Sequence, residues 1–305
     1  MSIKKKSCDI FIIGCGAAGL SAALGAFRGG CRNLIAADSA DSAGGILTRC
    51  AHRGFGVAEG PEPMTGNEYA NHLLRQLPDF YPEFLFSTTV LEVTEDKTAL
   101  AVSPDGLFEI EFKELIAALG SREIAPGELG IFGQHPKQIV TAGEIQEELN
   151  IFGTVPNGRS VILGAGDLGV IVAGQLYDLG IPPLCIVEKQ AVSSAMARNY
   201  RHCIEATGIP VLYQSTVCSV SGSPDLESIS VRHADGREAE LACELLIVAA
   251  GLKPERSLIS HLLNEEWLHL CGNCDKIYDI ADTAAREAFR VGKLCAERIY
   301  HAGHV

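Results

Sequence analysis

Gly14-Cys15-Gly16-Ala17-Ala18-Gly19 lies near the start of the chain, and Gly164-Ala165-Gly166-Asp167-Leu168-Gly169 repeats its glycine spacing in the second half. Each copy follows an apolar, strand-like run and precedes a run with the composition of a helix. Asp38 and Glu188 stand at the same distance after the first glycine of their respective copies. One such motif is weak evidence, whereas two in matched contexts predict two phosphate-binding turns.

Each part of the motif has a physical role. The first glycine permits a tight strand-to-helix turn, the second lets the backbone approach a pyrophosphate, and the third lets helix and strand pack closely. The N–H groups at the helix N-terminus then face the phosphates, and the acidic residue accepts hydrogen bonds from ribose hydroxyls. The pattern predicts two dinucleotide sites and electron transfer between the two nucleotides. The less favoured alternative is a pair of glycine turns that bind no ligand.

Glu188 also bears on the choice of nucleotide at the second site. A carboxylate there would repel a 2′-phosphate, so we expect NAD(H) to be preferred over NADP(H). Lys189 and Arg198 lie close in the sequence and could approach a phosphate. NADP(H) therefore stays open as the less favoured alternative.

Length and composition limit the class of protein. The 305 residues suggest about two domains, and with 47% hydrophobic and 21% charged residues they can bury sizeable cores. The net charge of −13 argues against nucleic acid and against an anionic membrane surface as partners. Eleven scattered cysteines favour reduced thiols in a cytoplasmic protein. The run Lys4–Lys6 before Ile10–Ile13 is better explained by a first strand than by a signal peptide, and no apolar stretch is long enough to span a bilayer.

The pattern of apolar residues predicts two nucleotide-binding units with a return to the first. Thr65 with Glu68, and Thr141 with Glu144, form capping boxes that open helices. The stretch 121–140 holds turn residues and predicts a domain crossover. We expect strands at 9–13, 33–37, 84–93, 98–102, 107–112, 115–119, 160–163, 184–187, 211–220, 227–233, 245–250 and 267–270, and helices at 17–28, 65–76, 167–179, 195–207 and 281–300.

Four further segments extend the pattern: Ile116–Arg122, Val248–Pro254, Leu268–Asn273 and the helix that begins near Asp282-Thr283-Ala284. With these, nearly the whole chain resembles the flavoproteins of the pyridine nucleotide–disulfide oxidoreductase superfamily that carry two dinucleotide-binding domains. Leu119 stands where that family usually has Thr, and Asn273 where it has Asp.

The resemblance implies an α/β protein with two Rossmann-like FAD/NAD(P)-binding domains of the three-layer ββα type. The FAD domain would be discontinuous, with residues 1–122 and 252–305, and the NAD(P)H domain would span 123–251. The implied FAD contacts are Gly14, Gly16, Ala17, Ala18, Gly19, Asp38, Ser39, Gly44, Gly45, Val90, Ala118, Leu119, Gly120, Gly272, Asn273, Asp282 and Thr283. The implied NAD contacts are Gly164, Gly166, Asp167, Leu168, Gly169, Glu188 and Gly251.

The segments Gly44–Gly56 and Met64–Ala70 carry a narrower resemblance. They are similar to the FAD/NAD subunits of opine-oxidase, hydrogen-cyanide-synthase and proline- or hydroxyproline-dehydrogenase complexes. They also look like small flavoproteins associated with anaerobic glycerol-3-phosphate dehydrogenases. This implies a second flavoprotein or an iron–sulfur protein as partner, and a small molecule or redox protein as electron acceptor. A homodimer is a further option, but the short stretch between Gly251 and Gly272 puts the usual dimer interface in doubt.

The cysteines depart from the disulfide reductases of this superfamily. Only Cys50 follows the Gly-Gly pair, and residues 121–163 contain no cysteine, so dithiol chemistry is not expected at either customary site. Cys271 and Cys274 form a Cys-x-x-Cys that could be a redox pair or half of a metal site, but they overlap the implied FAD contact, so we expect no metal. Cys50 with His52 could form an activated thiolate as a catalytic pair, and packing of the FAD loop is the alternative.

These features predict an FAD-dependent NAD(P)H oxidoreductase that exchanges hydride between NADH and the flavin. Two other functions stay open. The first is a flavin subunit that relays electrons inside a multi-subunit dehydrogenase. The second is a degenerate nucleotide-binding subunit with a structural or regulatory role, which the substitutions at Leu119 and Asn273 would fit.

Overall fold

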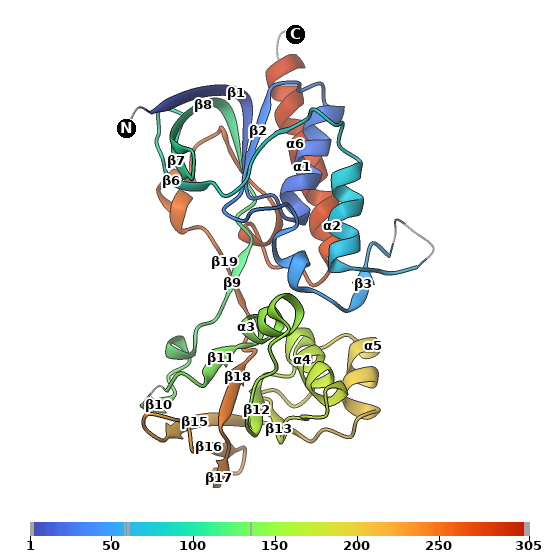
Figure 1. Cartoon of the computed structure of the whole chain (residues 1–305), viewed down its shortest axis with the longest axis vertical. Helices are drawn as coiled ribbons and strands as arrows, with labels where there is room; N and C mark the ends of the chain where they lie inside the picture. The colour runs from blue at the N-terminus through green and yellow to red at the C-terminus, as the bar shows by residue number, and fades with distance from the viewer. Residues whose placement is uncertain (1–2, 58, 60–61, 135, 302–305) are drawn as a thin grey trace. The chain divides into compact units, whose positions relative to one another are not determined.

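The computed structural model describes residues 3–57, 59, 62–134 and 136–301. The chain divides into two compact units, Met1–Arg122 with Lys253–Val305 and Glu123–Leu252. Two segments connect them, β9 (Ser121–Glu123) and β19 (Leu252–Pro254), and these pair as a two-stranded ribbon (Figure 1).

The first unit is built on a sheet of order β5-β2-β1-β8-β7-β6, with β20 also paired to β8. The strands β5, β2, β1, β8 and β20 are parallel, whereas β7 and β6 are antiparallel. Their bounds are Glu83–Leu85 (β5), Leu34–Ala37 (β2), Lys4–Ile13 (β1), Gly106–Ala117 (β8), Leu268–Leu270 (β20), Thr98–Ser103 (β7) and Thr89–Val93 (β6). A two-stranded hairpin of β3 (Arg53–Phe55) and β4 (Met64–Thr65) precedes the second helix.

Alternate side chains of β1 enter two different cores. Ile10 and Ile12 pack with residues of helices α1 (Ala17–Arg28), α2 (Gly66–Arg75) and α6 (Ala281–His301). Phe11 and Ile13 pack on the opposite face with residues of β6, β7 and β8. Because successive side chains of β1 point to opposite faces, the parallel strands have helices on one face and the antiparallel strands on the other. The unit therefore has three layers.

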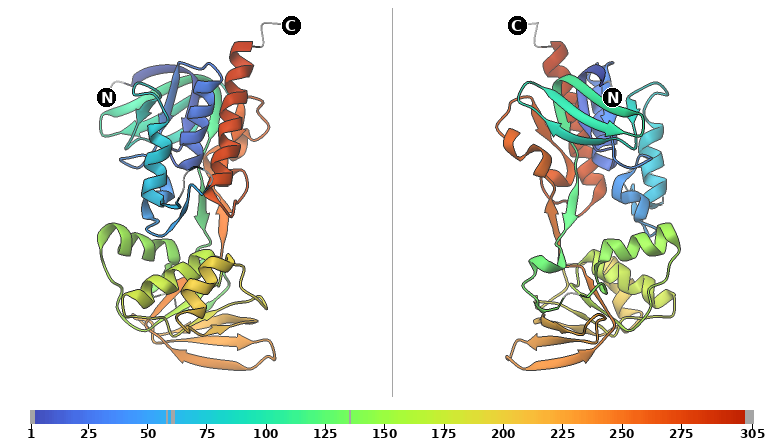
Figure 2. Two further views of the ribbon diagram at one scale, coloured as in Figure 1. Left: turned by 90° about the vertical axis from the view of Figure 1, so that its right-hand side faces the viewer. Right: turned by 60° about the vertical axis from the view of Figure 1, so that its left-hand side comes forward.

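Helix α6 returns to the first unit and packs against α1, as Figure 2 shows for the red and blue helices. Two glycines make the close approach possible. A Cβ on Gly25 would overlap the Phe289 carbonyl, and a Cβ on Gly292 would overlap the Ala22 carbonyl. The last helix is thus a structural part of the N-terminal unit.

The second unit repeats these layers. Its parallel sheet has the order β11-β18-β12-β13-β14, with bounds Ile139–Thr141, Leu245–Val248, Ser160–Leu163, Cys185–Val187 and Val211–Leu212. Helices α3 (Ala142–Glu147), α4 (Asp167–Asp178) and α5 (Ala197–Tyr200), the last continued by a π-helical turn at Arg201–Glu205, contribute to the core that contains Ile162. Val161 and Leu163 face a second sheet of β10 (Phe132–Gly133), β15 (Ser215–Ser221), β16 (Ser228–His233) and β17 (Glu238–Ala242).

Several local predictions are confirmed. Helix α1 has the predicted bounds, and both capping boxes are present. At the first box the Glu68 N–H donates to Thr65 Oγ1 at 3.2 Å, and the Thr65 N–H donates to Glu68 Oε2 at 2.8 Å. Lys4–Lys6 lie in β1, where they pair with Phe108–Ile110.

Other predictions are wrong. The expected strand 84–93 is two strands, because Ser87 has a φ of +48° and breaks it; β5 pairs with β2, and β6 pairs with β7. The strands expected at 107–112 and 115–119 are one strand, β8, because β1 pairs along its length. The helix expected at 195–207 starts at Ala197 and becomes π-helical after Tyr200.

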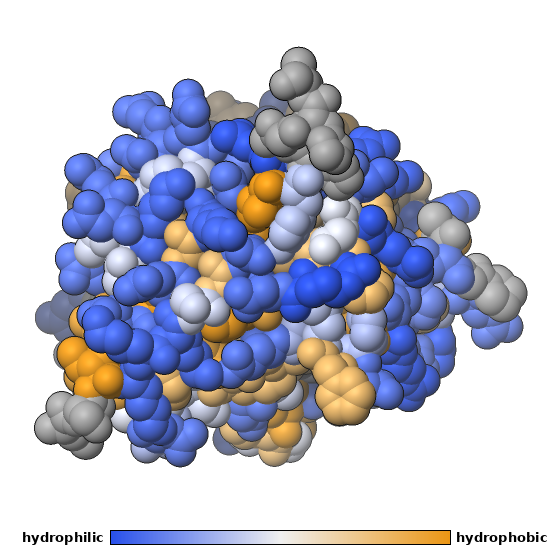
Figure 3. All heavy atoms as spheres, turned by 90° about the horizontal axis from the view of Figure 1, so that it is seen from above, coloured by the Kyte–Doolittle hydropathy of each residue, from blue (hydrophilic) through white to orange (hydrophobic). Residues whose placement is uncertain are grey.

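The face drawn in Figure 3 is largely hydrophilic, with apolar side chains in small separate groups. None of the helices in the described residues combines the length and apolar character that crossing a membrane requires.

Candidate functional site

The first glycine turn connects β1 to α1. Gly14 has a φ of +101°, and a Cβ there would overlap the Ala118 carbonyl. A Cβ on Gly19 would overlap the Gly14 carbonyl. Gly16 caps α1 without a side-chain hydrogen bond, so no capping side chain occupies the N–H groups of the first turn. Glycine at positions 14 and 19 thus lets the turn pack directly on backbone carbonyls, and the uncapped N–H groups at the N-terminus of α1 fit a bound pyrophosphate.

The second turn, between β12 and α4, has the same construction. Gly164 has a φ of +109°, and a Cβ there would overlap the Ala249 carbonyl. A Cβ on Gly169 would overlap the Gly164 carbonyl, and Gly166 caps α4 without a side-chain hydrogen bond. Both turns therefore fit the same chemical group.

The two acidic residues bind main-chain N–H groups in the same way. Asp38 accepts from Cys15 N–H on Oδ2 at 2.6 Å and from Ala40 N–H on Oδ1 at 2.9 Å. Glu188 accepts from Ala165 N–H on Oε2 at 2.7 Å and from Gln190 N–H on Oε1 at 2.7 Å. Each carboxylate oxygen keeps a second lone pair, so both groups can still accept ribose hydroxyls.

Most residues with an implied FAD contact gather around the first turn. Gly44 donates its N–H to the Cys15 carbonyl at 2.9 Å and forms a β-bridge with Gly16. A Cβ on Gly272 would lie 2.6 Å from Ala18 Cβ. Gly272 and the loop that contains Gly44 thus both reach the N-terminus of α1.

The other implied contacts have these places. Ser39 is exposed beside Asp38, and Val90 is half-buried on β6, where it pairs with Ala101. Gly120 has a φ of +72° and follows the half-buried Leu119. Asn273 accepts from Tyr278 N–H at 3.1 Å and donates to Ser121 Oγ at 3.4 Å.

Asp282 lies in the first turn of α6, next to Thr283. Its Oδ2 accepts from Gly56 N–H at 3.2 Å, whereas no described residue donates to its buried Oδ1. Tyr69 is fully buried, and burial together with the nearby Asp282 raises the pKa of its hydroxyl. A buried acceptor without a donor fits a bound polar group. The sequence did not identify Gly56 or Tyr69 as neighbours of Asp282. Gly56 lies 226 positions before Asp282, and no local signal connects positions so far apart.

Cys50, Cys271 and Cys274 do not have the properties of reactive thiols. Burial raises the pKa of Cys50 to about 11, although Arg49 lowers it in part, and its thiol donates to the Ile46 carbonyl at 3.4 Å. Cys271 and Cys274 are buried, burial raises the pKa of both, and Cys274 donates to the Ala117 carbonyl at 2.9 Å. Thiols with raised pKa are poor nucleophiles near neutral pH. These contacts favour the alternative, packing of the FAD loop, and a catalytic role for Cys50 with His52 stays a prediction.

In the second unit, polar side chains beyond the motif contact the glycine turn. Ser193 Oγ donates to the Ala165 carbonyl at 2.5 Å, and Asn199 Nδ2 donates to Asp167 Oδ1 at 2.7 Å. Leu168 packs on the helix-side core, and Gly251, with a φ of +112°, accepts from Ile124 N–H at 3.0 Å. Ser193 and Asn199 escaped sequence reasoning because neither belongs to a recognised spacing.

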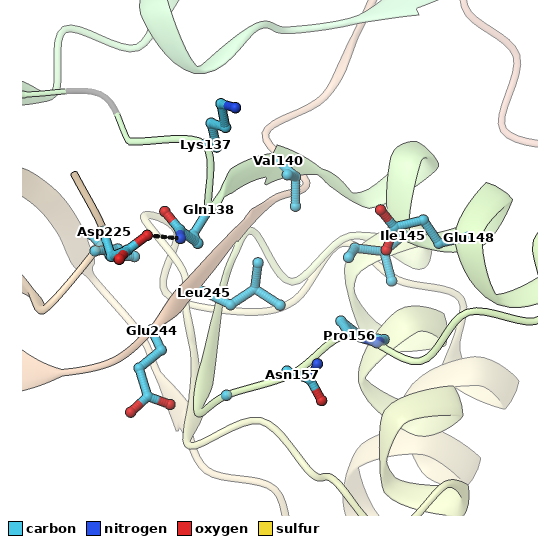
Figure 4. Close-up of a pocket in the computed structure, with 12 residues that line it drawn as sticks. Lys137, Gln138, Val140, Ile145, Glu148, Pro156, Asn157, Asp225, Glu244 and Leu245 are labelled. Atoms are coloured by element: carbon cyan, nitrogen blue, oxygen red, sulfur yellow. Dashed lines mark hydrogen bonds between the residues drawn. The ribbon is translucent and has the colours of Figure 1, made fainter. Parts of the chain in front are cut away.

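A separate pocket lies in the second unit, at the end of the parallel sheet opposite to the glycine turn (Figure 4). Gln138 and Leu245, at the amino ends of β11 and β18, line it, whereas Gly164 follows the carboxyl end of β12. Gln138 Nε2 donates to Asp225 Oδ1 at 2.6 Å in its wall. The pocket is therefore not part of the glycine-turn site.

Comparison with known proteins agrees with this geometry. Residues 8–288 match the family model described as pyridine nucleotide-disulphide oxidoreductase. The chain belongs to this family. It is a flavin-dependent oxidoreductase family that binds FAD and NAD(P), and membership supports FAD and NAD(H) as the cofactors here.

In two of the relatives, the match with this chain covers only part of the protein. The alpha subunit of the sarcosine oxidase of Rhizobium meliloti (strain 1021) is 25% identical, matching 83% of this chain and 25% of its own length. An opine oxidase subunit of Agrobacterium tumefaciens (strain Ach5) is 27% identical, matching 82% of this chain and 53% of its own length. The chain thus spans about a quarter and about half of these two relatives.

A crystal structure of Lactococcus lactis thioredoxin reductase has the same fold. Its TM-score is 0.77 at 18% identity, covering 96% of this chain and 99% of that one. The predicted architecture of two Rossmann-like FAD/NAD domains is confirmed.

Proposed function

We propose that this chain is an NADH-linked FAD oxidoreductase whose first unit binds FAD and whose second unit binds NAD(H). The observation that carries the proposal is the matched pair of glycine turns, each with a carboxylate bound to its second residue. A single turn of this kind would support one nucleotide, whereas two support a pair that exchanges electrons.

The assignment of FAD to the first unit rests on what surrounds its turn. The Gly44–Gly45 loop and Gly272 reach the N-terminus of α1, where the pyrophosphate would be held by main-chain N–H groups. Asp38 would accept hydrogen bonds from the ribose. Asp282 would orient the flavin end through its Oδ1, to which no described residue donates. When bound, FAD supplies the hydride-accepting chemistry, and the protein supplies position and electrostatics.

The assignment of NAD(H) to the second unit rests on Glu188. Glu188 is 8% exposed, and two main-chain N–H donors fix the orientation of its carboxylate group. A fixed negative charge at the ribose would repel a 2′-phosphate. NADH is accordingly the proposed substrate, with NADPH the weaker one.

The test is a visible absorption spectrum of the purified protein before and after anaerobic addition of NADH, with NADPH as the matched control. We expect flavin bands that bleach with NADH and bleach more slowly with NADPH. A protein that is colourless, and stays so after incubation with FAD, would contradict the flavin assignment. Bands that persist with both nucleotides would contradict the NADH assignment alone.

A second candidate is an electron-relay component of a larger dehydrogenase. Two relatives favour it, because their names describe them as subunits of a sarcosine oxidase and of an opine oxidase. The physiological acceptor would then be a partner flavoprotein or iron–sulfur protein rather than a free small molecule. Steady-state oxidation of NADH by the isolated chain with an artificial acceptor separates the two, since a pure relay would give negligible turnover.

A further inference from the structure

The two glycine turns differ in how the following loop is held against them. In the first unit the contact is made through the backbone. The Gly44 N–H donates to the Cys15 carbonyl at 2.9 Å, and a Cβ on Gly45 would lie 3.1 Å from Gly16 Cα. Glycine at these positions leaves no side chain that could adjust the contact.

In the second unit, side chains make the corresponding contact. The Ala165 carbonyl, the counterpart of the Cys15 carbonyl, accepts from Ser193 Oγ at 2.5 Å. Asp167, at the motif position that Ala17 holds in the first unit, accepts on Oδ1 from Met196 N–H at 2.9 Å and from Asn199 Nδ2 at 2.7 Å. Asn199 is itself 8% exposed, so this amide is part of the packed structure.

These contacts place residues 193–199 beside the N-terminus of α4. Ser194 Oγ is the nearest atom, at 3.5 Å, to the position that a Cβ on Gly166 would take. Asp167 is the first residue of α4, where an unscreened carboxylate would oppose a negative pyrophosphate. The two donors on Oδ1 stabilise that charge and direct it toward the 193–199 segment.

We propose that Asp167, Ser193 and Asn199 form a latch that sets the affinity of the second nucleotide site. These are positioning residues: they hold the 193–199 segment and the Asp167 carboxylate in the arrangement that admits the pyrophosphate. The inference rests on the proposed binding of NAD(H) in this unit. In the first unit, a rigid backbone contact would favour retention of FAD. In the second unit, side-chain contacts that can break would favour exchange of NAD(H).

The test is calorimetric titration of the FAD-loaded protein with ADP-ribose, which carries the pyrophosphate and both riboses but no nicotinamide. Asn199→Ala is expected to raise the dissociation constant about tenfold, because it releases the 193–199 segment and leaves the Asp167 carboxylate less well stabilised beside the pyrophosphate. Asp167→Ala breaks the contacts with both Met196 and Asn199 but also removes that negative charge, so it should raise the dissociation constant by a smaller factor. Ser193→Ala, which removes the neutral bond to the Ala165 carbonyl and the one accepted from the Ala195 N–H at 3.0 Å, should raise it about threefold. Asp167→Asn keeps an acceptor oxygen and should stay within about threefold of the unmodified protein.

Two further measurements distinguish the latch from general loss of structure. The double variant Asp167→Ala/Asn199→Ala should bind no more weakly than the worse single variant, because both changes break the same contact. FAD content, read from visible absorbance, should not change in any of these variants. Ser42→Ala, in the corresponding loop of the first unit, serves as the matched control and should leave ADP-ribose binding unchanged.

Unchanged binding in Asn199→Ala, or single effects that multiply in the double variant, would overturn the latch while leaving the NAD(H) site intact. An unmodified protein that binds FAD but no ADP-ribose would overturn the proposed NAD(H) site, and the latch with it.

Discussion

The main-chain N–H of Cys15 donates to Oδ2 of Asp38 at 2.6 Å. This contact connects the acidic residue at the end of β2 to the glycine turn at the end of β1, so the proposed ribose acceptor is held against the proposed phosphate-binding turn. The same contact recurs in the second unit between Ala165 and Glu188. Each carboxylate is therefore expected to act on its nucleotide together with the turn that it binds.

Replacing Asp38 with Ala should weaken FAD binding at least about tenfold, because it removes the ribose acceptor and leaves the Cys15 N–H without its charged partner. Quenching of FAD fluorescence on titration measures this directly. Asp41→Ala is the control, since the Asp41 side chain accepts from the neighbouring exposed Ser42. Equal FAD affinity in the Asp38 and Asp41 variants would rule out the proposed role of Asp38.

Replacing Glu188 with Ala should reduce the preference for NADH over NADPH by about tenfold, because the charge that repels the 2′-phosphate is removed. The quantity to compare is the ratio of kcat/KM for the two nucleotides, with an artificial electron acceptor. Glu227→Ala, in the same unit, is the control and should leave the ratio unchanged. A Glu188 variant that keeps the original ratio would refute this explanation of the nucleotide preference.

Replacing Gly25 with Ala should destabilise the first unit by about 1–3 kcal/mol, because the added methyl group meets the Phe289 carbonyl and forces α1 and α6 apart. Urea denaturation, followed by circular dichroism, measures the change. Gly127→Ala, in the second unit, is the control for a methyl group added in open space, since no atom of the described residues beyond its chain neighbours lies within 4 Å of a Cβ there, and the change should stay within about 0.5 kcal/mol. Equal midpoints for the two variants would show that the helix contact can relax freely.

The thiol of Cys50 should react slowly with iodoacetamide near neutral pH. Its pKa of about 11 lies above the ordinary thiol value, so the thiolate fraction near pH 8 is about a hundredfold below that of a thiol with pKa 9. Mass spectrometry of the modified peptide as a function of pH gives the rate, which should rise until about pH 11. A rate that levels off below pH 9 would instead support the activated thiolate.

Much of the fold could be predicted because its signals are local. Helix α1 and the capping box at Thr65 depend on residues within a few positions of one another. The glycine spacing similarly predicted both turns, since a tight strand-to-helix connection has few backbone solutions. The prediction of one strand at 84–93 was wrong because it used local alternation alone. The alternation is continuous in the sequence, but β5 pairs with β2 and β6 pairs with β7.

Local spacing in the sequence was enough to predict two glycine turns, each joining a strand to a helix and each followed by an acidic residue. The groups from distant parts of the chain that contact those turns became known from the three-dimensional fold. Gly56 reaches Asp282 across 226 positions, and the segment after Glu188 is held by Asp167 and Asn199 rather than by glycine. Local patterns reflect backbone geometry and side-chain periodicity. The contacts between distant residues depend instead on the order of the strands in the sheet and on which helices pack on it.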